Sequence, residues 1–176
     1  QAIVNHGAAG GASLPHPHAQ VVAADLTPSE IVAEVARVAT GRDPCLICAE
    51  ASRQRDEDTL LIGSPGADLW CPWWSSAPYE MLLAPRRHSP SFEEADDELP
   101  AVGRVLHEGL ARLGRLLGDP PYNLAVHSRP PGLAADFHWH VHVWPRLQRD
   151  GGFERATGVL VTVVDPADAT RRLRSG

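Results

Sequence analysis

The stretch FHWHVHVWP, residues 137–145, constrains the fold most, because polar and apolar residues alternate along it. Its histidines are His138, His140 and His142, and tryptophan or valine stands between and after them. Successive side chains of a β-strand point to opposite faces, so we expect the three histidines on one face and the apolar residues on the other. Three imidazoles on one face favour a functional strand over a run of surface histidines, because neutral imidazoles bind metals, attack phosphorus or shuttle protons.

Other segments predict a sheet with one long helix. Apolar residues recur at helical spacing on one face of residues 95–117, which predicts a long helix there. Thr27-Pro28-Ser29-Glu30 has the N-cap, proline and capping-box glutamate that begin a helix, and Asp165-Pro166 begins a final short one. Strands are expected over residues 2–5, 20–24, 59–62, 68–71, 79–84, 122–126, 138–144 and 158–164. This order predicts an α+β domain built on an antiparallel sheet.

Composition narrows the possible partners. The 176 residues suffice for a compact domain, and the net charge of −6 argues against a nonspecific nucleic-acid or membrane binder. No apolar run reaches the length of a membrane span, and no secretory signal is visible. Three cysteines, two of them in Cys45-Leu-Ile-Cys48, do not form a secreted disulfide framework, so a reducing cytoplasm is the expected location.

The chain shows a hint of internal repetition. Residues 5–20 hold a loop followed by His-x-His-x-Gln, and residues 123–142 hold a loop followed by His-x-His-x-His. We interpret these as equivalent segments of a duplicated fold. Residues 1–24 would then be the tail of a first repeat with an active-site loop, and residues 25–176 the second repeat.

The segment His16-Pro17-His18 suits nucleophilic chemistry at phosphorus. The proline stiffens the link and fixes where both imidazoles aim, and a neutral ring nitrogen can form a reactive phosphoramidate. Gln20 can donate a hydrogen bond to phosphate but cannot serve as an acid or base near neutral pH. His-x-His-x-Gln therefore favours group transfer, whereas His-x-His-x-His favours hydrolysis.

The pair Cys45-x-x-Cys48 is one arm of a possible zinc site, because two thiolates at this spacing can bind one ion around a turn. Alone, the pair is also compatible with a redox couple. His88 and the clustered histidines could complete a tetrahedral site. Cys71 lies in an apolar strand and is expected to be a core residue, and most of the five tryptophans are expected to pack in the core.

Together these motifs resemble a known family. Gly11-x-Ser13-x-x-His16-Pro17-His18-x-Gln20 is similar to the active-site signature of the galactose-1-phosphate uridylyltransferases, members of the histidine-triad superfamily. The CxxC, the Pro-Arg-Arg-His ending at residue 88, and the segments 119–123, 138–146 and 152–158 resemble the C-terminal half of those enzymes. The resemblance implies a histidine-triad-like antiparallel sheet with one long helix and shorter helices.

The resemblance also implies a ping-pong reaction. His18 would attack the α-phosphorus of UDP-glucose and pass the uridylyl group to galactose 1-phosphate. Ser13 and Gln20 match positions that hold phosphate oxygens, and Asn5 matches one beside the nucleotide. Phe153 and Glu154 match the hexose-contacting region.

Two metal sets are implied by different relatives. One set binds zinc through positions matching Cys45, Cys48, His88 and His138; the other binds a metal through positions matching Glu34, His127, His140 and His142. We favour the zinc set, because thiolates pair with histidines at this spacing to bind zinc, and a second metal is possible. His16 matches a ligand of the family's first zinc site, whose cysteines lie in the N-terminal half.

The chain begins at Gln1 and reaches the active-site signature within a few residues. We therefore expect that an N-terminal half, either a separate subunit or a part of the enzyme outside this sequence, completes the nucleotide pocket. The chain alone should then be nearly inactive. A dimer is the family expectation.

Three alternatives remain at this point. A histidine-triad nucleotide hydrolase would use His140 as nucleophile with His142 assisting, but it leaves the His16–Gln20 segment unexplained. An ADP-glucose phosphorylase, which hands the nucleotidyl group to phosphate, shares almost every residue named above. A zinc-stabilised interaction subunit would bind a partner without catalysis, and the substitution His18→Ala would leave that binding unchanged.

Overall fold

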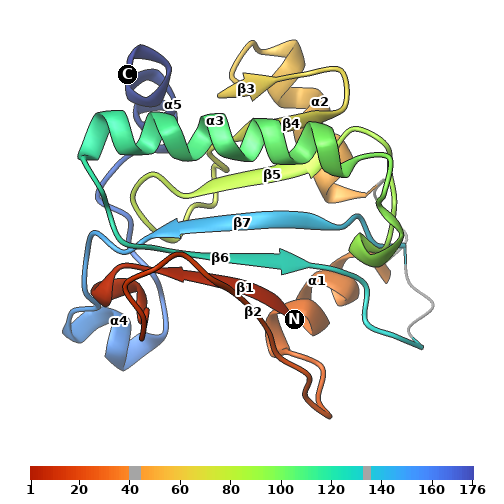
Figure 1. Cartoon of the computed structure of the whole chain (residues 1–176), viewed down its shortest axis with the longest axis horizontal. Coiled ribbons are helices and arrows are strands. Elements are labelled where there is room, and N and C mark those ends of the chain that lie inside the picture. Colours follow the sequence, from red (N-terminus) through yellow and green to blue (C-terminus); the bar gives the residue numbers. More distant parts are fainter. Residues whose placement is uncertain (40–44, 133–135) are drawn as a thin grey trace.

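The computed structural model describes residues 1–39, 45–132 and 136–176. Its centre is a seven-stranded antiparallel sheet in the order β2-β1-β6-β7-β5-β4-β3 (Figure 1). The strands are β1 Ala2–His6, β2 Ala19–Val21, β3 Ile62–Gly63, β4 Ala67–Trp70, β5 Met81–Pro85, β6 Tyr122–His127 and β7 His140–Pro145. The helices are α1 Ser29–Ala39, α2 Leu46–Asp56, α3 Leu99–Leu117, α4 Gly152–Thr157 and α5 Pro166–Ser175, with short 3₁₀ turns η1 Ala8–Gly10 and η2 Phe92–Glu94.

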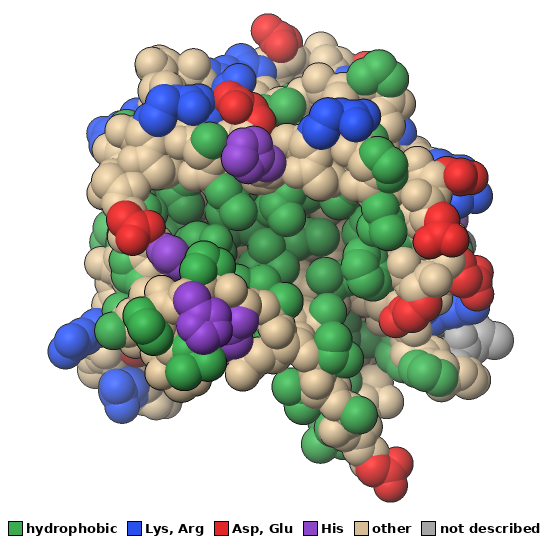
Figure 2. All heavy atoms as spheres, in the orientation of Figure 1, with side chains coloured by type: hydrophobic (Ala, Val, Ile, Leu, Met, Phe, Trp, Pro, Cys, Tyr) green, Lys and Arg blue, Asp and Glu red, His purple; other side chains and the backbone are tan. Residues whose placement is uncertain are grey.

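The long helix α3 covers one face of the sheet, and α5 packs beside it (Figure 1). The main apolar core lies here and includes Met81 and Leu83 from β5 and Val141 and Val143 from β7, all buried. Below α3, hydrophobic side chains gather in a hollow over β5, β7 and β6 (Figure 2). The alternation of β7 therefore places its valines in the core.

The second face carries the polar residues of the central strands. Leu82 and Ala84 of β5 point to this face and pack with Ala51 and Ile47 of α2 in a smaller apolar cluster. Helix α1 reaches the same face, where Glu34 contacts His127 at the end of β6. One face thus supplies the core and the other supplies the candidate chemistry.

The predicted α+β fold with an antiparallel sheet, one long helix and shorter helices is confirmed. The Asp165 carboxylate caps α5 as expected, accepting hydrogen bonds from the backbone N–H groups of Ala167 and Asp168. The sequence predicts that the helix beginning at Thr27-Pro28 runs to about Thr40 and stops at Gly41, and that end lies outside the described residues.

One predicted strand is wrong. Residues 158–164 follow α4 as irregular chain, although the segment is apolar. Val159, Leu160, Val161 and Val163 are exposed, between 42% and 77%. A segment of high β-propensity forms a strand only when its backbone can hydrogen-bond to the edge of a neighbouring strand. Helices α2 and α4 were not predicted from the sequence.

Among the described residues, no helix is both long and apolar enough to cross a bilayer.

Candidate functional site

The loop between β1 and β2, residues 7–18, here called the HPH loop, forms a pocket with the end of β1 and with Asp119. This pocket has a volume of about 350 Å³. Asn5, Ser13 and His16, three of the residues singled out in the sequence, contribute to its lining. His18 and Gln20 are not among the lining residues; His18 is half-buried at the loop's end, and Gln20 is exposed in β2, opposite Ile3.

The backbone fixes the tautomer of His18. Its Nδ1 lies 3.0 Å from the carbonyl oxygen of His16. A carbonyl can only accept, so Nδ1 carries a proton, and in the neutral ring Nε2 is the nitrogen with the free lone pair. His140 repeats the arrangement, with Nδ1 2.8 Å from the carbonyl oxygen of His138. The two His-x-His segments therefore share this hydrogen bond.

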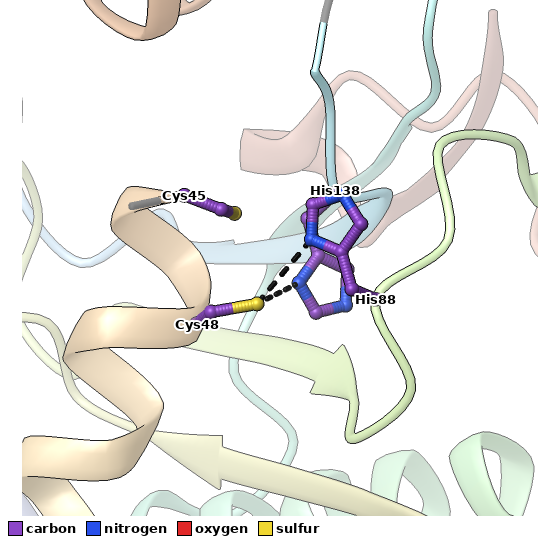
Figure 3. Close-up of side chains that lie close together, drawn as sticks. All are labelled: Cys45, Cys48, His88 and His138. Carbon is purple, nitrogen blue, oxygen red and sulfur yellow. Dashed lines mark hydrogen bonds between the residues drawn. The ribbon is translucent and has the colours of Figure 1, made fainter. Parts of the chain in front are cut away.

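Cys45, Cys48, His88 and His138 form the first of two clusters, the cysteine–histidine cluster (Figure 3). The Cys48 Sγ lies 3.3 Å from His88 Nδ1 and 3.2 Å from His138 Nδ1. Around a tetrahedral zinc ion, sulfur and nitrogen ligands stand about 3.5 Å apart. The cysteines are placed by α2, which begins just after Cys45, rather than by the turn expected from the sequence.

Further features of this cluster fit zinc. His88 turns its Nε2 to the Asp136 carboxylate at 2.7 Å, an outer partner of the kind that orients metal-bound imidazoles. Burial lowers the pKa of His138 to about 4, so its ring is neutral and able to bind metal near neutral pH. Burial and the neighbouring Cys45 raise the pKa of Cys48 to about 12, and the positive charge of Arg55 offsets them only in small part.

Glu34, His127, His140 and His142 form the glutamate–histidine cluster. His127 Nδ1 lies 2.9 Å and His140 Nε2 3.8 Å from Glu34 Oε1. Burial alone would raise the pKa of Glu34, but the contacts with His127 and His140 hold it well below its usual range. Burial lowers the pKa of His142 to about 4.

The predicted histidine triplet is divided between the two clusters. His138 precedes β7 and joins the cysteines, whereas His140 and His142 lie in the strand and join Glu34. The backbone of Trp139 donates a hydrogen bond to the carbonyl of Ser89, outside the β7 ladder. The alternation of side chains therefore holds within β7. His138, the first histidine of the triplet, belongs to the segment that leads into the strand.

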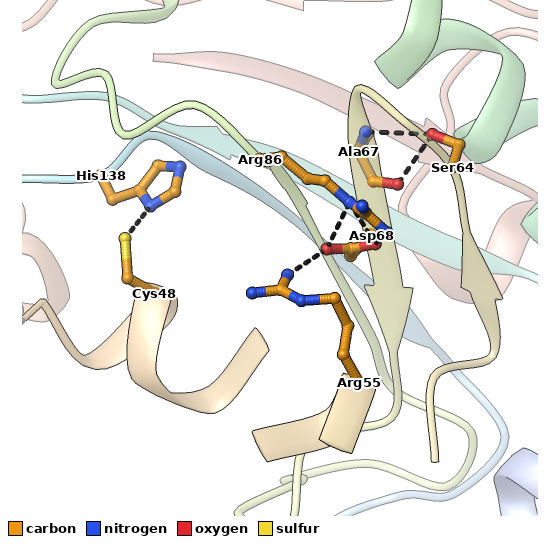
Figure 4. A network of polar contacts seen from close by, with 7 residues as sticks. All are labelled: Cys48, Arg55, Ser64, Ala67, Asp68, Arg86 and His138. Carbon is orange, nitrogen blue, oxygen red and sulfur yellow. Dashed lines mark hydrogen bonds and ion pairs between the residues drawn. The ribbon is translucent and has the colours of Figure 1, made fainter. Parts of the chain in front are cut away.

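A buried carboxylate connects α2 to the sheet beside the cysteine–histidine cluster (Figure 4). Asp68 of β4 is 1% exposed and accepts hydrogen bonds from Arg55 of α2, at 2.5 Å, and from Arg86, which follows β5. Arg86 stands two residues before His88. Asp68 therefore ties together two segments that carry cluster residues.

The remaining predicted site residues lie on the surface. Phe153 is 57% exposed on α4, and Glu154 accepts a hydrogen bond from the backbone N–H of Gly151, which caps that helix. His16 is exposed in the HPH loop, with its ring centroid 5.7 Å from that of His18. Among the described residues, His16 joins no cluster of metal-ligand atoms.

Sequence reasoning missed two polar residues of the pocket. His6 Nε2 lies 2.7 Å from the Asp119 carboxylate, and its ring stacks on Tyr122 at 4.8 Å. Both His6 and Asp119 line the pocket. They stand more than a hundred residues apart, so only the β1–β6 pairing, which sets His6 opposite Tyr122, could have placed them together.

Comparison with known proteins finds curated relatives of two names. ADP-glucose phosphorylase from Arabidopsis thaliana is 28% identical over 99% of this chain and 51% of its own length. Galactose-1-phosphate uridylyltransferase from Cryptococcus neoformans is 29% identical over 99% of this chain and 51% of its own. The chain thus spans about half the length of these curated relatives. No family model matches it.

Solved structures agree. An Arabidopsis thaliana ADP-glucose phosphorylase with bound ADP-glucose aligns with a TM-score of 0.89 at 27% identity, over 99% of this chain and 58% of that one. A histidine-triad-like protein from Bartonella henselae aligns with a TM-score of 0.54 at 14% identity, over 72% and 93%, which supports the fold alone. The resemblance to the uridylyltransferases is therefore confirmed: the chain is a homologue of galactose-1-phosphate uridylyltransferase and of ADP-glucose phosphorylase, with the histidine-triad fold.

Proposed function

We propose that the chain carries the nucleophile of a nucleotidyltransferase that moves a uridylyl group from UDP-glucose to galactose 1-phosphate. The observation that carries the proposal is the bond from His18 Nδ1 to the His16 carbonyl in the HPH loop. It leaves Nε2 unprotonated at the loop's end, next to a pocket that Asn5 and Ser13 line.

Two displacements at one phosphorus make up the reaction. The Nε2 lone pair of His18 attacks the α-phosphorus, an N–P bond forms, and the bond to the β-phosphate oxygen breaks, which releases glucose 1-phosphate. A phosphate oxygen of galactose 1-phosphate then attacks the same phosphorus and the N–P bond breaks. Ser13, Gln20 and Asn5 would donate hydrogen bonds to the phosphate oxygens, and Phe153 and Glu154 would contact the hexose.

The environment of His140 favours His18 as the nucleophile. His140 is 3% exposed, and its Nε2 faces Glu34 rather than open space. A hydrolase that used His140 would need that nitrogen free for substrate. Gln20 stands where a hydrolase of this kind would carry a histidine, and an amide cannot protonate a leaving group near neutral pH.

An ADP-glucose phosphorylase is the second candidate. The Arabidopsis thaliana enzyme of that name is similar to this chain in sequence and in structure. The chemistry at His18 would be unchanged, with an adenylyl group transferred to phosphate instead of a uridylyl group transferred to a sugar phosphate.

We further propose that the cysteine–histidine cluster binds zinc. Two thiolates and two imidazoles are the donors of a structural zinc site, and the four ligand atoms lie within 4.8 Å of one another. Zinc there would join α2, the segment after β5 and the segment that leads into β7. The glutamate–histidine cluster is the proposed place for a second metal.

A second polypeptide segment is proposed to complete the pocket. Strand β2 lies at one edge of the sheet, and its residues are exposed. The apolar residues of the 158–164 segment are exposed as well. Both surfaces are available to the N-terminal half expected from the duplicated-fold interpretation, in which residues 1–24 end a first repeat and residues 25–176 form the second.

Intact-mass spectrometry tests the function. The protein is incubated with UDP-glucose or with ADP-glucose, alone and with the N-terminal half if one is found. A gain of one uridylyl or one adenylyl group identifies the donor. Loss of that adduct on adding galactose 1-phosphate supports the uridylyltransferase, and loss on adding inorganic phosphate supports the phosphorylase.

Two variants make the test specific. His18→Ala should abolish the adduct, whereas His107→Ala, an exposed histidine on α3, should leave it unchanged. Release of free UMP without an adduct, abolished by His140→Asn but not by His18→Ala, would identify a hydrolase instead.

A further inference from the structure

The chain contains two asparagines, Asn5 and Asn123, and the fold pairs them. They stand directly opposite each other in the β1–β6 ladder. Their neighbours Val4 and Leu124 belong to the core face, so both carboxamides lie on the opposite face, the one that carries the histidines of β7. Asn5 lines the pocket, and Asn123 stands behind it.

The hydrogen bonds of Asn123 fix its orientation. Its Nδ2 lies 2.6 Å from the carbonyl oxygen of Gly10 and 2.7 Å from Asn5 Oδ1. The Gly10 carbonyl only accepts, so the Asn123 atom facing it must be the nitrogen. The atom of Asn5 that faces this nitrogen must then be its oxygen. The Asn5 amide nitrogen is therefore the end left to serve the pocket.

The glycines of the HPH loop bring the same loop against β6. A Cβ at Gly10 would lie 2.8 Å from the carbonyl oxygen of Tyr122. A Cβ at Gly7, whose φ is +71°, would lie 2.9 Å from the Pro121 side chain. Only glycine permits this approach, and it brings the Gly10 carbonyl within reach of Asn123.

From this geometry we propose that Asn123 is a positioning residue for the transfer reaction. It holds the Asn5 carboxamide with its oxygen turned away, so that the two N–H donors of Asn5 meet the phosphate oxygens in the pocket. Pre-oriented donors contribute most where charge develops during transfer. Asn123 touches no reacting atom and acts through Asn5 and the HPH loop. The catalytic part of this inference rests on the proposed function.

The first experiment needs no substrate. Selective ¹⁵N-asparagine labelling gives two side-chain carboxamide signals, one from each residue. In the wild-type protein, the Asn123 protons should exchange slowly with solvent and the Asn5 protons rapidly. In Asn123→Asp, the carboxylate can only accept, so Asn5 must turn its nitrogen toward it, and its signal should become protected. Rapid exchange of both wild-type signals, or an unprotected Asn5 in the variant, overturns the proposal.

The second experiment uses adduct formation from UDP-glucose or ADP-glucose. Asn123→Asp should slow adduct formation about 100-fold, the loss typical of removing one donor to a developing negative charge. Nucleotide-sugar affinity should change much less. Gln1→Glu is the control: the Gln1 amide also donates to a β6 carbonyl, that of Val126 at 2.8 Å, at the far end of the same strand pair.

A double-mutant cycle separates a positioning role from a structural one. If Asn123 acts through Asn5, Asn123→Ser should slow adduct formation strongly in the wild type but little further in Asn5→Ala. Multiplying effects would overturn the proposal. If the wild-type protein forms no adduct with either donor, the proposed function fails, while the exchange experiment still decides the orientation of Asn5.

Discussion

Asp136 lies outside the cysteine–histidine cluster but determines which nitrogen His88 offers to it. Its carboxylate lies 2.7 Å from His88 Nε2, so Nδ1 faces the cluster. Asp136→Asn should lower the zinc affinity about tenfold, at the lower end of the range for outer-shell partners, because Asp136 is exposed. Competition with a chromophoric chelator measures this. Asp25→Asn, on the exposed connection before α1, should leave the affinity unchanged.

The titration of Cys48 predicts how zinc binding depends on pH. Without metal, burial raises the pKa of its thiol to about 12, so the thiol is protonated at any lower pH. Zinc binds the thiolate, so this proton must be released. Affinity should therefore rise with pH, about tenfold per unit for Cys48 alone. The pKa of His138, about 4, lies too low to add to this between pH 6 and 8. Equal affinities at pH 6 and pH 7.5 would contradict the prediction.

At the scale of an element, two glycines of α3 should respond in opposite ways. A Cβ at Gly109 would lie 2.5 Å from Leu69 Cδ2 in the buried core, whereas nothing lies within 4 Å of a Cβ at Gly103. Gly109→Ala should lower the free energy of unfolding by about 1–3 kcal/mol through overpacking. Gly103→Ala should raise it by about 0.5–1 kcal/mol through helix propensity. Urea unfolding of both variants measures the difference, and equal midpoints would mean that Leu69 can move aside.

The contact of α2 with the sheet depends on Asp68. Asp68→Asn removes the charge that Arg55 and Arg86 share, and breaking such a buried pair costs about 3 kcal/mol. Thermal unfolding of the metal-free protein should show the loss. Zinc affinity should also fall, because α2 places both cysteines. Glu108→Gln, which removes an exposed carboxylate from α3, should change neither quantity noticeably; a similar loss there would mean that charge alone is responsible.

Local patterns predicted most elements, and tertiary contacts account for the exceptions. Alternation is visible in β6 and β7, and helical spacing in α3, because each packs one face against the main core. Strand β5 is a continuous apolar run because both of its faces are buried. Helix α2 is mostly polar and has no marked apolar face, so no helical pattern is visible in its sequence. Its position depends on the contact of Arg55 with Asp68 of β4. The 158–164 segment has the composition of a strand but no ladder partner among the described residues.

The candidate site was predictable only where a motif was local. His16, His18 and Gln20 alternate within one short stretch, and their chemistry follows from that spacing. The CxxC spacing, His88 and the clustered histidines already indicated a zinc site, whereas the resemblance supplied the membership of the glutamate–histidine cluster. The pairing of Asn5 with Asn123 and of His6 with Asp119 depends on β1 lying beside β6, which no short pattern specifies.

At the scale of the whole molecule, exposed apolar surface predicts association. Leu160 and Val163 are 56% and 77% exposed on one irregular segment. Contiguous apolar surface of this kind marks interaction sites. We expect the chain alone to self-associate, with a weight-average mass that rises above 19.0 kDa with concentration in sedimentation velocity. Leu160→Ser with Val163→Ser should suppress this. Val32→Ser, an exposed valine on α1, is the control, and concentration-independent monomers would contradict the prediction.

Strand β6 connects the two ends of the candidate site, which has a consequence for changes in chain length. Asn123, near its start, supports the HPH loop, and His127, at its end, belongs to the glutamate–histidine cluster. Both point to the same face because they are four residues apart. Losing or gaining one residue between them would turn one of the two into the core. Over evolutionary time this strand should accept many substitutions but no insertions or deletions, whereas the exposed connection after β7 should vary freely in length.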